Sequence, residues 1–343
     1  MDPVAALHAI AFELERTRAP TYRVRAFRRA AQATADLPAG DLADRLRRGT
    51  LRDVAGIGPA TALVIEQAAA GQQPDYLAKL LQETPPEAAP SALRTALRGD
   101  CHTHSDWSDG GSPPREMAEA ARDLGHEWIA LTDHSPRLTV ANGLSAERLQ
   151  EQLDVIGRLN AELSPFRILT GIEVDILDDG SLDQSDELLG QLDMVVASVH
   201  SHLRMDAGPM TQRMVAAVSN PLVDVLGHCT GRLGAGPGGR EGRGGRGRPE
   251  SVFDADAVFG ACRDHGVAVE INCRPERQDP PDRLLQLAAE LGGVLAIDTD
   301  AHAPGQLAWQ DSGGCARAEQ AGIGPERVIN TRGAGDLTAP AGP

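Results

Sequence analysis

Several residue types are scarce in this chain of 343 residues, and each shortage excludes a class of structure or chemistry. Lysine occurs once, as Lys79, so covalent catalysis through a lysine Schiff base is not expected. The five cysteines are scattered and form no Cys-x-x-Cys pair, which argues against a disulfide framework and against a zinc ribbon. No apolar run approaches the roughly 20 residues that cross a bilayer, and the N-terminus lacks a signal-peptide pattern. We therefore expect a cytoplasmic protein without a membrane segment.

The charge is unevenly distributed along the chain, although the net value is -16. Residues 1–99 carry 13 basic and 11 acidic side chains, whereas residues 100–343 carry 20 basic and 38 acidic ones. A carboxylate-rich larger part with a mildly basic attachment fits a metal-dependent enzyme whose smaller part meets an anionic partner.

Residues 1–83 have the pattern of a small helical domain. Apolar side chains recur at helical spacing from Val4 to Leu14 and again from Val24 to Ala35. A turn containing glycines at residues 54–60 separates two further predicted helices. Residues 84–97 begin with a proline-rich stretch that lacks periodicity, so we interpret them as a linker.

From residue 98 to residue 335, short apolar runs alternate with amphipathic segments. The runs cover residues 128–131, 167–170, 194–197, 223–226, 267–271 and 294–297. Strands and helices that alternate in this way indicate a parallel α/β barrel or sheet. Residues 234–249 are rich in Gly and Arg and are predicted to form a flexible loop, with contact to a nucleic-acid backbone as an open alternative. Residues 336–343 are predicted to be a flexible tail.

Histidines and carboxylates directly follow these runs, in a pattern that predicts a metal site. They are His102, His104, Asp133, His134, Glu173, His200, His228, Asp300 and His302. The carboxyl ends of parallel barrel strands converge at one mouth, so we expect these side chains to lie close together. The i, i+2 spacing of His102 and His104 puts both imidazoles on one side of a strand end. Any one histidine alone would more simply be structural, but their shared position favours metal binding.

Glu173 is placed to bridge two cations, since one carboxylate can hold two ions roughly 3.5–4 Å apart. Nitrogen and carboxylate ligands without a thiolate suit Zn, Mn or Fe better than Mg alone, so we predict two or three divalent metal ions. Amidohydrolase-type barrels also open with His-x-His and commonly bridge their metals with a carboxylated lysine. Lys79 lies outside the predicted barrel, so that interpretation has no bridging residue.

Four motifs resemble those of the PHP (polymerase and histidinol phosphatase) family over about residues 98–335. They are Asp100-Cys101-His102-Thr103-His104-Ser105, Leu131-Thr132-Asp133-His134-Ser135, Ser198-Val199-His200-Ser201 with Leu226-Gly227-His228, and Thr299-Asp300-Ala301-His302. The resemblance implies a distorted (β/α)7 TIM-like barrel. It also implies phosphoester hydrolysis at a trinuclear site, in which a metal-bound hydroxide attacks phosphorus.

A ligand set follows from the resemblance. The first ion would be held by His102, His104, Glu173 and Asp300, the second by Glu173, His200 and His228, and the third by Asp109, His134 and His302. Asp106 is near enough to compete with Asp109. Three further residues would orient the ligating imidazoles or fill space, namely His202, Asp133 and Asp298. We interpret His126 and His265 as structural.

An anionic substrate needs cations or N–H donors in addition to metals. Residues 270–279 resemble the family's pocket-lining segment, so Asn272 and Arg277 are candidates for phosphate contacts, with Arg232 as a third. For each arginine, a surface ion pair is an equal alternative. We predict that catalysis depends on a group of four residues, Glu173, Asp300, His302 and Arg277.

The turn Gly56-Ile57-Gly58-Pro59-Ala60 resembles a helix-hairpin-helix turn, whose glycines let backbone N–H groups approach a DNA phosphate. Gly56, Gly58 and Ala60 are therefore the DNA-binding candidates. With Tyr22-Arg23-Val24-Arg25-Ala26-Phe27, this turn resembles the N-terminal domain of bacterial family X DNA polymerases. About 15 residues separate it from the barrel, which leaves no room for a polymerase palm, so we expect no polymerase activity.

Together these features favour a metal-dependent phosphoesterase that acts on DNA ends without sequence specificity, as a 3′ to 5′ exonuclease or 3′-end repair enzyme. The strongly acidic barrel favours an alternative, a small-molecule phosphomonoesterase of the histidinol-phosphatase kind. A third alternative is a non-catalytic DNA-binding scaffold, which the retained ligand set argues against. The sequence leaves the oligomeric state open.

Overall fold

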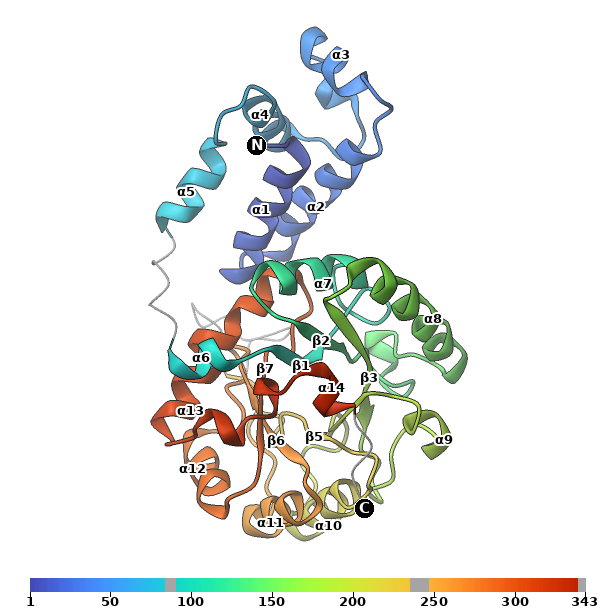
Figure 1. The fold of residues 1–343 in the computed structure, drawn as a ribbon, viewed down its shortest axis with the longest axis vertical. Helices are drawn as coiled ribbons and strands as arrows, with labels where there is room; N and C mark the ends of the chain where they lie inside the picture. The colour runs from blue at the N-terminus through green and yellow to red at the C-terminus, as the bar shows by residue number, and fades with distance from the viewer. Residues whose placement is uncertain (84–90, 235–246, 339–343) are drawn as a thin grey trace. The chain divides into compact units, whose positions relative to one another are not determined.

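The computed structural model describes residues 1–83, 91–234 and 247–338 (Figure 1). The chain divides into two compact units, Met1–Ala89 and Pro90–Pro343. Most of the predicted Gly/Arg-rich loop and the proline-rich start of the predicted linker lie outside the described residues. None of the described helices is both long enough and apolar enough to cross a membrane.

The N-terminal unit is all helical. Its helices are α1 Pro3–Arg16, α2 Thr21–Ala35, α3 Asp41–Arg48, α4 Pro59–Ala69 and α5 Asp75–Glu83. Asp2 caps α1 by accepting a hydrogen bond from the backbone of Ala5 at 2.9 Å, and Pro3 fits the first helical position because its missing N–H needs no partner there. The predicted periodicity is seen in the core, where Leu7, Ile10 and other apolar residues of α1 are buried.

Seven parallel strands form the centre of the second unit, in the order of the sequence from β1 to β7. They are β1 Gly99–Thr103, β2 Trp128–Leu131, β3 Arg167–Asp175, β4 Met194–Ser198, β5 Val225–Leu226, β6 Ala268–Asn272 and β7 Leu295–Asp298. Thr103 pairs with Ala301 just beyond β7, which brings the two sheet edges together. The result is the predicted TIM-like α/β barrel, nearly closed, with the helices outside the strands (Figure 1).

The outer helices of the barrel unit are α6 Ala92–Ala96, α7 Pro114–Asp123, α8 Ala146–Leu163, α9 Asp186–Leu189, α10 Ala207–Val218, α11 Ala255–His265, α12 Asp282–Leu291, α13 Ala316–Gln320 and α14 Ala334–Leu337. Helix α6 corrects the predicted linker, because Leu93 and Leu97 are buried in the barrel core. Helix α14 shortens the predicted tail, since Asp336 accepts a hydrogen bond from the backbone of Gly333 at 3.2 Å. Residues 339–343 lie outside the described residues.

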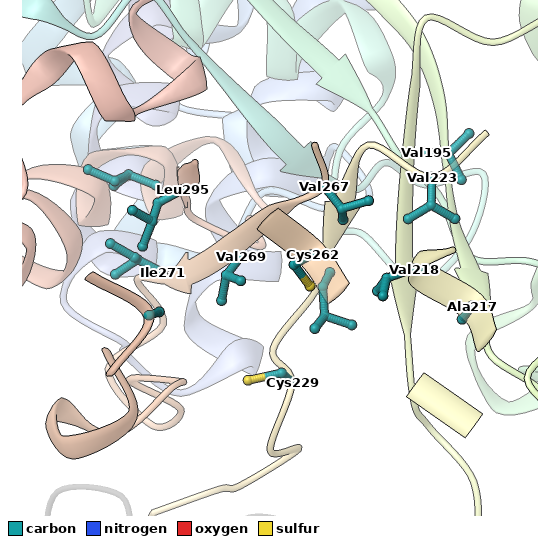
Figure 2. Close-up of a cluster of buried hydrophobic side chains, with 14 of the residues drawn as sticks. Val195, Ala217, Val218, Val223, Cys229, Cys262, Val267, Val269, Ile271 and Leu295 are labelled. Atoms are coloured by element: carbon teal, nitrogen blue, oxygen red, sulfur yellow. The ribbon is translucent and has the colours of Figure 1, made fainter. Parts of the chain in front are cut away.

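Apolar side chains between the strands and the outer helices hold the barrel together. Figure 2 shows Val195, Val269 and Ile271 from the strands beside Val218 of α10 and Cys262 of α11. Full burial of one aliphatic side chain contributes about 1.5–3 kcal/mol, so the barrel walls are firmly anchored. This rigid frame fixes the residues at the strand ends.

Candidate metal centre

Strand ends and the loops that follow them carry nine side chains to one mouth of the barrel. They are His102 in β1 with His104 and Asp109 after it, His134 after β2, Glu173 in β3, His200 after β4, His228 after β5, and Asp300 and His302 after β7. The carboxyl ends of parallel barrel strands share one face, which is why residues nearly two hundred positions apart meet.

Glu173 lies at the centre of the cluster and is 1% exposed. Its Oε2 lies 3.4 Å from Nε2 of His102 and 3.6 Å from Nε2 of His104. Its Oε1 lies 3.3 Å from Nε2 of His200 and 2.8 Å from Nε2 of His228. The two oxygens therefore face two different histidine pairs, which is the arrangement of a bridging carboxylate.

Asp109 and two histidines form the outer part of the cluster. The Oδ1 atom of Asp109 lies 3.5 Å from Nε2 of His134 and 3.3 Å from Nε2 of His302. Asp106 belongs to none of the metal-competent groups among the described residues, and its backbone N–H instead donates to the carbonyl of Ser112. Of the two aspartates that compete in the sequence, the structure brings Asp109 to the site.

Asp300 joins the inner and outer parts of the cluster. Its Oδ1 lies 3.3 Å from Nε2 of His104 and 3.4 Å from Nδ1 of His302. The backbone of Asp300 has φ of 52°, in the left-handed region that non-glycine residues rarely adopt. Such strained residues cluster at functional sites, where the surrounding structure imposes the conformation.

Orphaned polar atoms show that these side chains fit divalent cations. Both oxygens of Glu173 and Nε2 of His102, His200 and His228 are buried without a hydrogen-bond partner among the described residues. Nδ1 of His134 lies 2.7 Å from Glu173 but is not aligned as a hydrogen bond. Buried polar groups are rarely left without partners, so atoms aimed at a common centre in this way indicate metal ligands.

Three groups of residues could each hold an ion, because the ligand atoms within each group all lie within 4.8 Å of one another. They are His102, His104 and Asp300; His134, Glu173 and His200; and His104, Asp109, His134 and His302. Nitrogen and oxygen donors without sulfur are typical of sites for zinc, manganese or iron.

The surroundings of the cluster keep two of its carboxylates ionised and one of its imidazoles neutral. Burial opposes ionisation of Glu173, yet the surrounding histidines, His200 foremost, hold its pKa well below the ordinary value. Burial likewise opposes the charge of Asp300, but the guanidinium of Arg274 keeps the pKa of that carboxyl low. Burial and the neighbouring His302 lower the pKa of His104. Ionised carboxylates and a neutral imidazole are the forms that bind metal.

Two carboxylates that sequence reasoning missed orient the imidazoles. Nδ1 of His102 lies 2.6 Å from Glu270, and Nδ1 of His200 contacts Asp175, so both rings turn Nε2 toward Glu173. Asp175 lies two residues after Glu173 on the same strand, which is a spacing that could have pointed to it. Nothing in the local sequence links Glu270 to a histidine 168 positions away.

The residues expected to orient imidazoles have other partners. Asp133 accepts hydrogen bonds from Ser105, Ser108 and Gln152. Asp298 accepts from the backbone of Cys101 and from the Asn330 side chain. His202 is exposed and contacts Asp178. Among the described residues, none of the three makes a hydrogen bond to a candidate ligand imidazole, which favours the alternative that they fill space.

Two of the predicted substrate residues lie directly beside the metal cluster. Nε of Arg277 lies 3.2 Å from Oδ2 of Asp300, and the Asn272 amide donates to the same oxygen at 3.3 Å. Arg274, which the sequence did not single out, lies 3.5 Å from Asp300 Oδ1 and 3.4 Å from Nδ1 of His302. Arg232 contacts Glu250 instead, at 3.6 Å.

The glycine turn of the helical unit leads into α4. Gly56 has φ of 97°, and a side chain there would collide with Arg29. Gly58 precedes the helix, and its N–H donates to the Thr61 hydroxyl at 2.9 Å. Within the described residues, the backbone N–H of Ala60 has no protein partner, as expected in the first turn of a helix. A pocket of about 300 Å³ lies over this turn, lined also by Tyr22, Arg23, Phe27 and Tyr76.

Comparison with protein families gives one match, the PHP domain, over residues 100–274. That span is just over half of the chain. It contains seven of the nine candidate ligand positions described above, and the other two, Asp300 and His302, follow β7.

Individual relatives fall into two groups. The DNA polymerase/3′-5′ exonuclease PolX of Bacillus subtilis (strain 168) is 40% identical over 243 residues, which cover 71% of this chain and 40% of that protein. This chain therefore spans less than half the length of that relative. A probable phosphatase of Thermoanaerobacter sp. (strain X514) is 28% identical over 218 residues, covering 59% of this chain and 78% of the relative.

Among solved structures, the histidinol phosphate phosphatase of Lactococcus lactis, complexed with zinc, L-histidinol and phosphate, aligns with a TM-score of 0.48. The alignment covers 66% of this chain and 95% of the other, at 20% sequence identity.

Proposed function

The chain belongs to the PHP domain family and is a hydrolase of phosphoesters, and from this premise we propose that it acts on phosphodiester bonds at DNA ends, as a 3′ to 5′ exonuclease or 3′-end repair enzyme. One observation carries the proposal. The chain combines a Glu173-centred metal cluster with a helical unit whose glycine turn presents an unpaired N–H at the start of α4.

Nine residues would hold two or three zinc, manganese or iron ions. Glu173 would be shared between His102, His104 and Asp300 on one side and His200 and His228 on the other, and Asp109, His134 and His302 would hold the outer ion. Such ions activate water near neutral pH and neutralise the charge that develops on a phosphate.

The protein's own residues would position the phosphate. The guanidinium groups of Arg274 and Arg277 both lie against Asp300, so their remaining N–H groups border the metal cluster. Planar guanidinium groups suit bidentate contact with phosphate oxygens. Asn272 is held between Glu270 and Asp300, so its contribution is to fix Asp300 in place.

The helical unit would grip the DNA backbone. A helix N-terminus with an unpaired N–H attracts phosphate, and the absence of a side chain at Gly58, where a Cβ would point into open space, permits close approach. The absence of one at Gly56 instead makes room for Arg29. Ala60 contributes its backbone N–H. Arg23 lines the adjacent pocket and adds positive charge.

A small phosphomonoester is the alternative substrate, and the acidity of the barrel favours it. Residues 100–343 carry 38 acidic and 20 basic side chains. Such an acidic surface would repel a long polyanion everywhere outside the mouth that holds the metal ions. The similarity to a probable phosphatase points the same way.

One experiment separates the two substrates. The purified protein, supplied with Mn or Zn, is incubated with a 5′-labelled DNA primer and, separately, with histidinol phosphate, using His102→Ala as the inactive control. Shortening of the primer from its 3′ end that disappears in the control supports the proposal. Phosphate release from histidinol phosphate alone contradicts it. Ala60→Asp should weaken primer hydrolysis about tenfold at low salt by placing a negative charge beside the phosphate.

A further inference from the structure

The loop after β5 folds on itself and is bonded to the loop after β6, because the backbone N–H of Gly234 donates to the carbonyl of Glu276 at 2.5 Å. Leu233 and Arg248 exchange two backbone hydrogen bonds, at 3.0 and 2.9 Å. The backbone N–H of Ser251 donates to the carbonyl of Thr230 at 2.8 Å. These bonds fix the backbone positions of Arg232 and Arg248 relative to each other.

A pocket of about 520 Å³ opens at the loop after β5. Its described lining consists of Arg232, Leu233, Gly234, Arg248, Pro249 and Glu250. Glu250 lies 3.6 Å from Arg232 but also contacts Arg283, so its single negative charge is divided between two guanidinium groups. The two arginines and Arg283 therefore outnumber the one carboxylate, and the pocket carries a positive charge on an otherwise acidic barrel.

The backbone links the pocket lining to two segments that lie at the metal cluster, the one at His228 and the one at Arg277. Arg232 follows His228 by four residues, a stretch of chain that spans at most roughly 14 Å. The 2.8 Å hydrogen bond from the N–H of Gly231 to the carbonyl of His228 folds it into a shorter path. The backbone carbonyl of Glu276, which directly precedes Arg277, accepts a hydrogen bond from Gly234 of the pocket lining. Arg277 in turn contacts Asp300.

We propose that Arg232 and Arg248 bind a phosphate adjacent to the one that is held at the metal cluster. The inference rests on the proposed function and narrows its substrate class to molecules with consecutive phosphates, such as a nucleic-acid strand. The guanidinium geometry suits phosphate oxygens, and a phosphomonoester such as histidinol phosphate has no second phosphate to place there. The inference also gives the two predicted substrate arginines different roles. Arg277 contacts the reacting phosphate, and Arg232 contacts the phosphate next to it.

Competition with p-nitrophenyl phosphate hydrolysis tests the inference. The probes are thymidine 3′,5′-bisphosphate, thymidine 5′-monophosphate and thymidine 3′-monophosphate, each measured as an inhibition constant with the metal-loaded protein. The bisphosphate should inhibit about tenfold more strongly than either monophosphate, as expected for charge-assisted contacts that are partly exposed. In the double variant Arg232→Gln, Arg248→Gln, this advantage should fall to about twofold or less.

Matched variants guard against a merely structural effect. Arg263→Gln removes an exposed arginine of α11 that pairs with its neighbour Asp264, and it should keep the full bisphosphate advantage. Glu250→Gln removes the competing carboxylate, so the advantage should grow about threefold. Arg248 donates a hydrogen bond to the carbonyl of Gly231. In Arg248→Gln the amide N–H of glutamine can make the same bond, so the substitution removes the positive charge and keeps this contact.

Two results would overturn the inference: no bisphosphate advantage in the unmodified protein, or an equal advantage in the double variant. Failure of the proposed function is a different result, which the primer assay detects as the absence of primer shortening. Primer shortening without a bisphosphate advantage would keep the proposed function and reject the adjacent-phosphate pocket. A bisphosphate advantage without primer shortening would keep the pocket and reject DNA as the substrate.

Discussion

Two buried carboxylates at the ends of neighbouring strands have opposite surroundings. Asp133, after β2, and Glu173, in β3, are each 1% exposed. Asp133 accepts hydrogen bonds from the Ser105 backbone at 2.8 Å, the Ser105 hydroxyl at 2.7 Å, the Ser108 hydroxyl at 2.5 Å and the Gln152 amide at 2.7 Å. Glu173 accepts no aligned hydrogen bond from any described residue.

The contrast shows how a structural carboxylate differs from a candidate metal ligand. Burial raises the pKa of Asp133, although its donors partly offset the effect. At Glu173 the histidines overcome burial and lower the pKa. A buried charge without hydrogen bonds is costly, so Glu173 makes physical sense only with cations beside it. Proximity in the sequence to a histidine, which Asp133 has, is a weaker sign of metal binding than unsatisfied atoms.

Glu173→Gln should have the largest effect in this comparison. The amide cannot supply two anionic oxygens to two ions, so the rate of phosphoester hydrolysis should fall by at least about 10³-fold. The measurement is the initial rate on p-nitrophenyl phosphate at saturating Mn or Zn. Retention of more than a tenth of the rate would show that Glu173 is not the bridging residue.

Asp133→Asn should instead lower stability and leave the metal content intact. The amide cannot accept from all four donors, so the free energy of unfolding should fall by about 1–3 kcal/mol. Urea denaturation of the metal-free protein measures this change, and plasma mass spectrometry measures the metal content. If this variant lost metal while its free energy of unfolding stayed unchanged, Asp133 would act as a metal ligand and would not differ from Glu173 in the proposed way.

Asp175→Asn tests the orientation of His200. An amide in place of the carboxylate weakens the hold on Nδ1 of His200, so affinity for the weakest-bound ion should fall about 10- to 100-fold. Competition with a metal-binding dye gives the affinity directly. Asp178→Asn is a matched control, because Asp178 contacts the exposed His202 rather than a ligand, and it should leave the affinity unchanged.

His126 is a buried histidine outside the metal cluster and can be compared with the candidate ligands. Among the described residues, both of its ring nitrogens are buried without hydrogen bonds, and it belongs to no group that could hold a metal ion. Burial, with a smaller effect of Arg94, lowers the pKa of His126 to about 3. The unfolded chain therefore binds this proton first, so stability is full above about pH 6.5 and declines as the pH falls toward 3.

His126→Leu should remove that dependence. Between pH 7 and pH 5 the unmodified protein should lose about 2 kcal/mol more stability than the variant. Urea denaturation in the presence of a chelator, at both pH values, keeps metal binding out of the comparison. Equal losses in the two proteins would mean that His126 is not held neutral in the folded state.

Much of the barrel could be predicted from the sequence because strand and helix alternate and the ligand-type residues sit at the strand ends. Position alone distinguishes His102 and His104 from an ordinary histidine such as His126. The order of the strands follows because consecutive parallel strands joined by a crossover usually lie side by side. Helix α6 was mistaken for linker because its five residues are too few to show periodicity.

The contacts between distant segments could not be predicted from the sequence. Glu270 of β6 meets His102 of β1, and Arg274 meets His302, only because the barrel brings β6, β7 and β1 together around one mouth. The separation of Arg232 from Arg277 depends on loop hydrogen bonds that leave no trace in residue pattern. Side-chain partners of buried carboxylates likewise depend on the folded loops.

The most direct test of the central claim is the metal content of the purified protein beside that of Glu173→Gln. Each is dialysed against Mn or Zn, freed of unbound metal and measured by plasma mass spectrometry. We expect two or three ions per chain in the unmodified protein and at most about one in the variant, because Glu173 is shared between ions. Equal metal content in the two proteins would contradict a site built around Glu173.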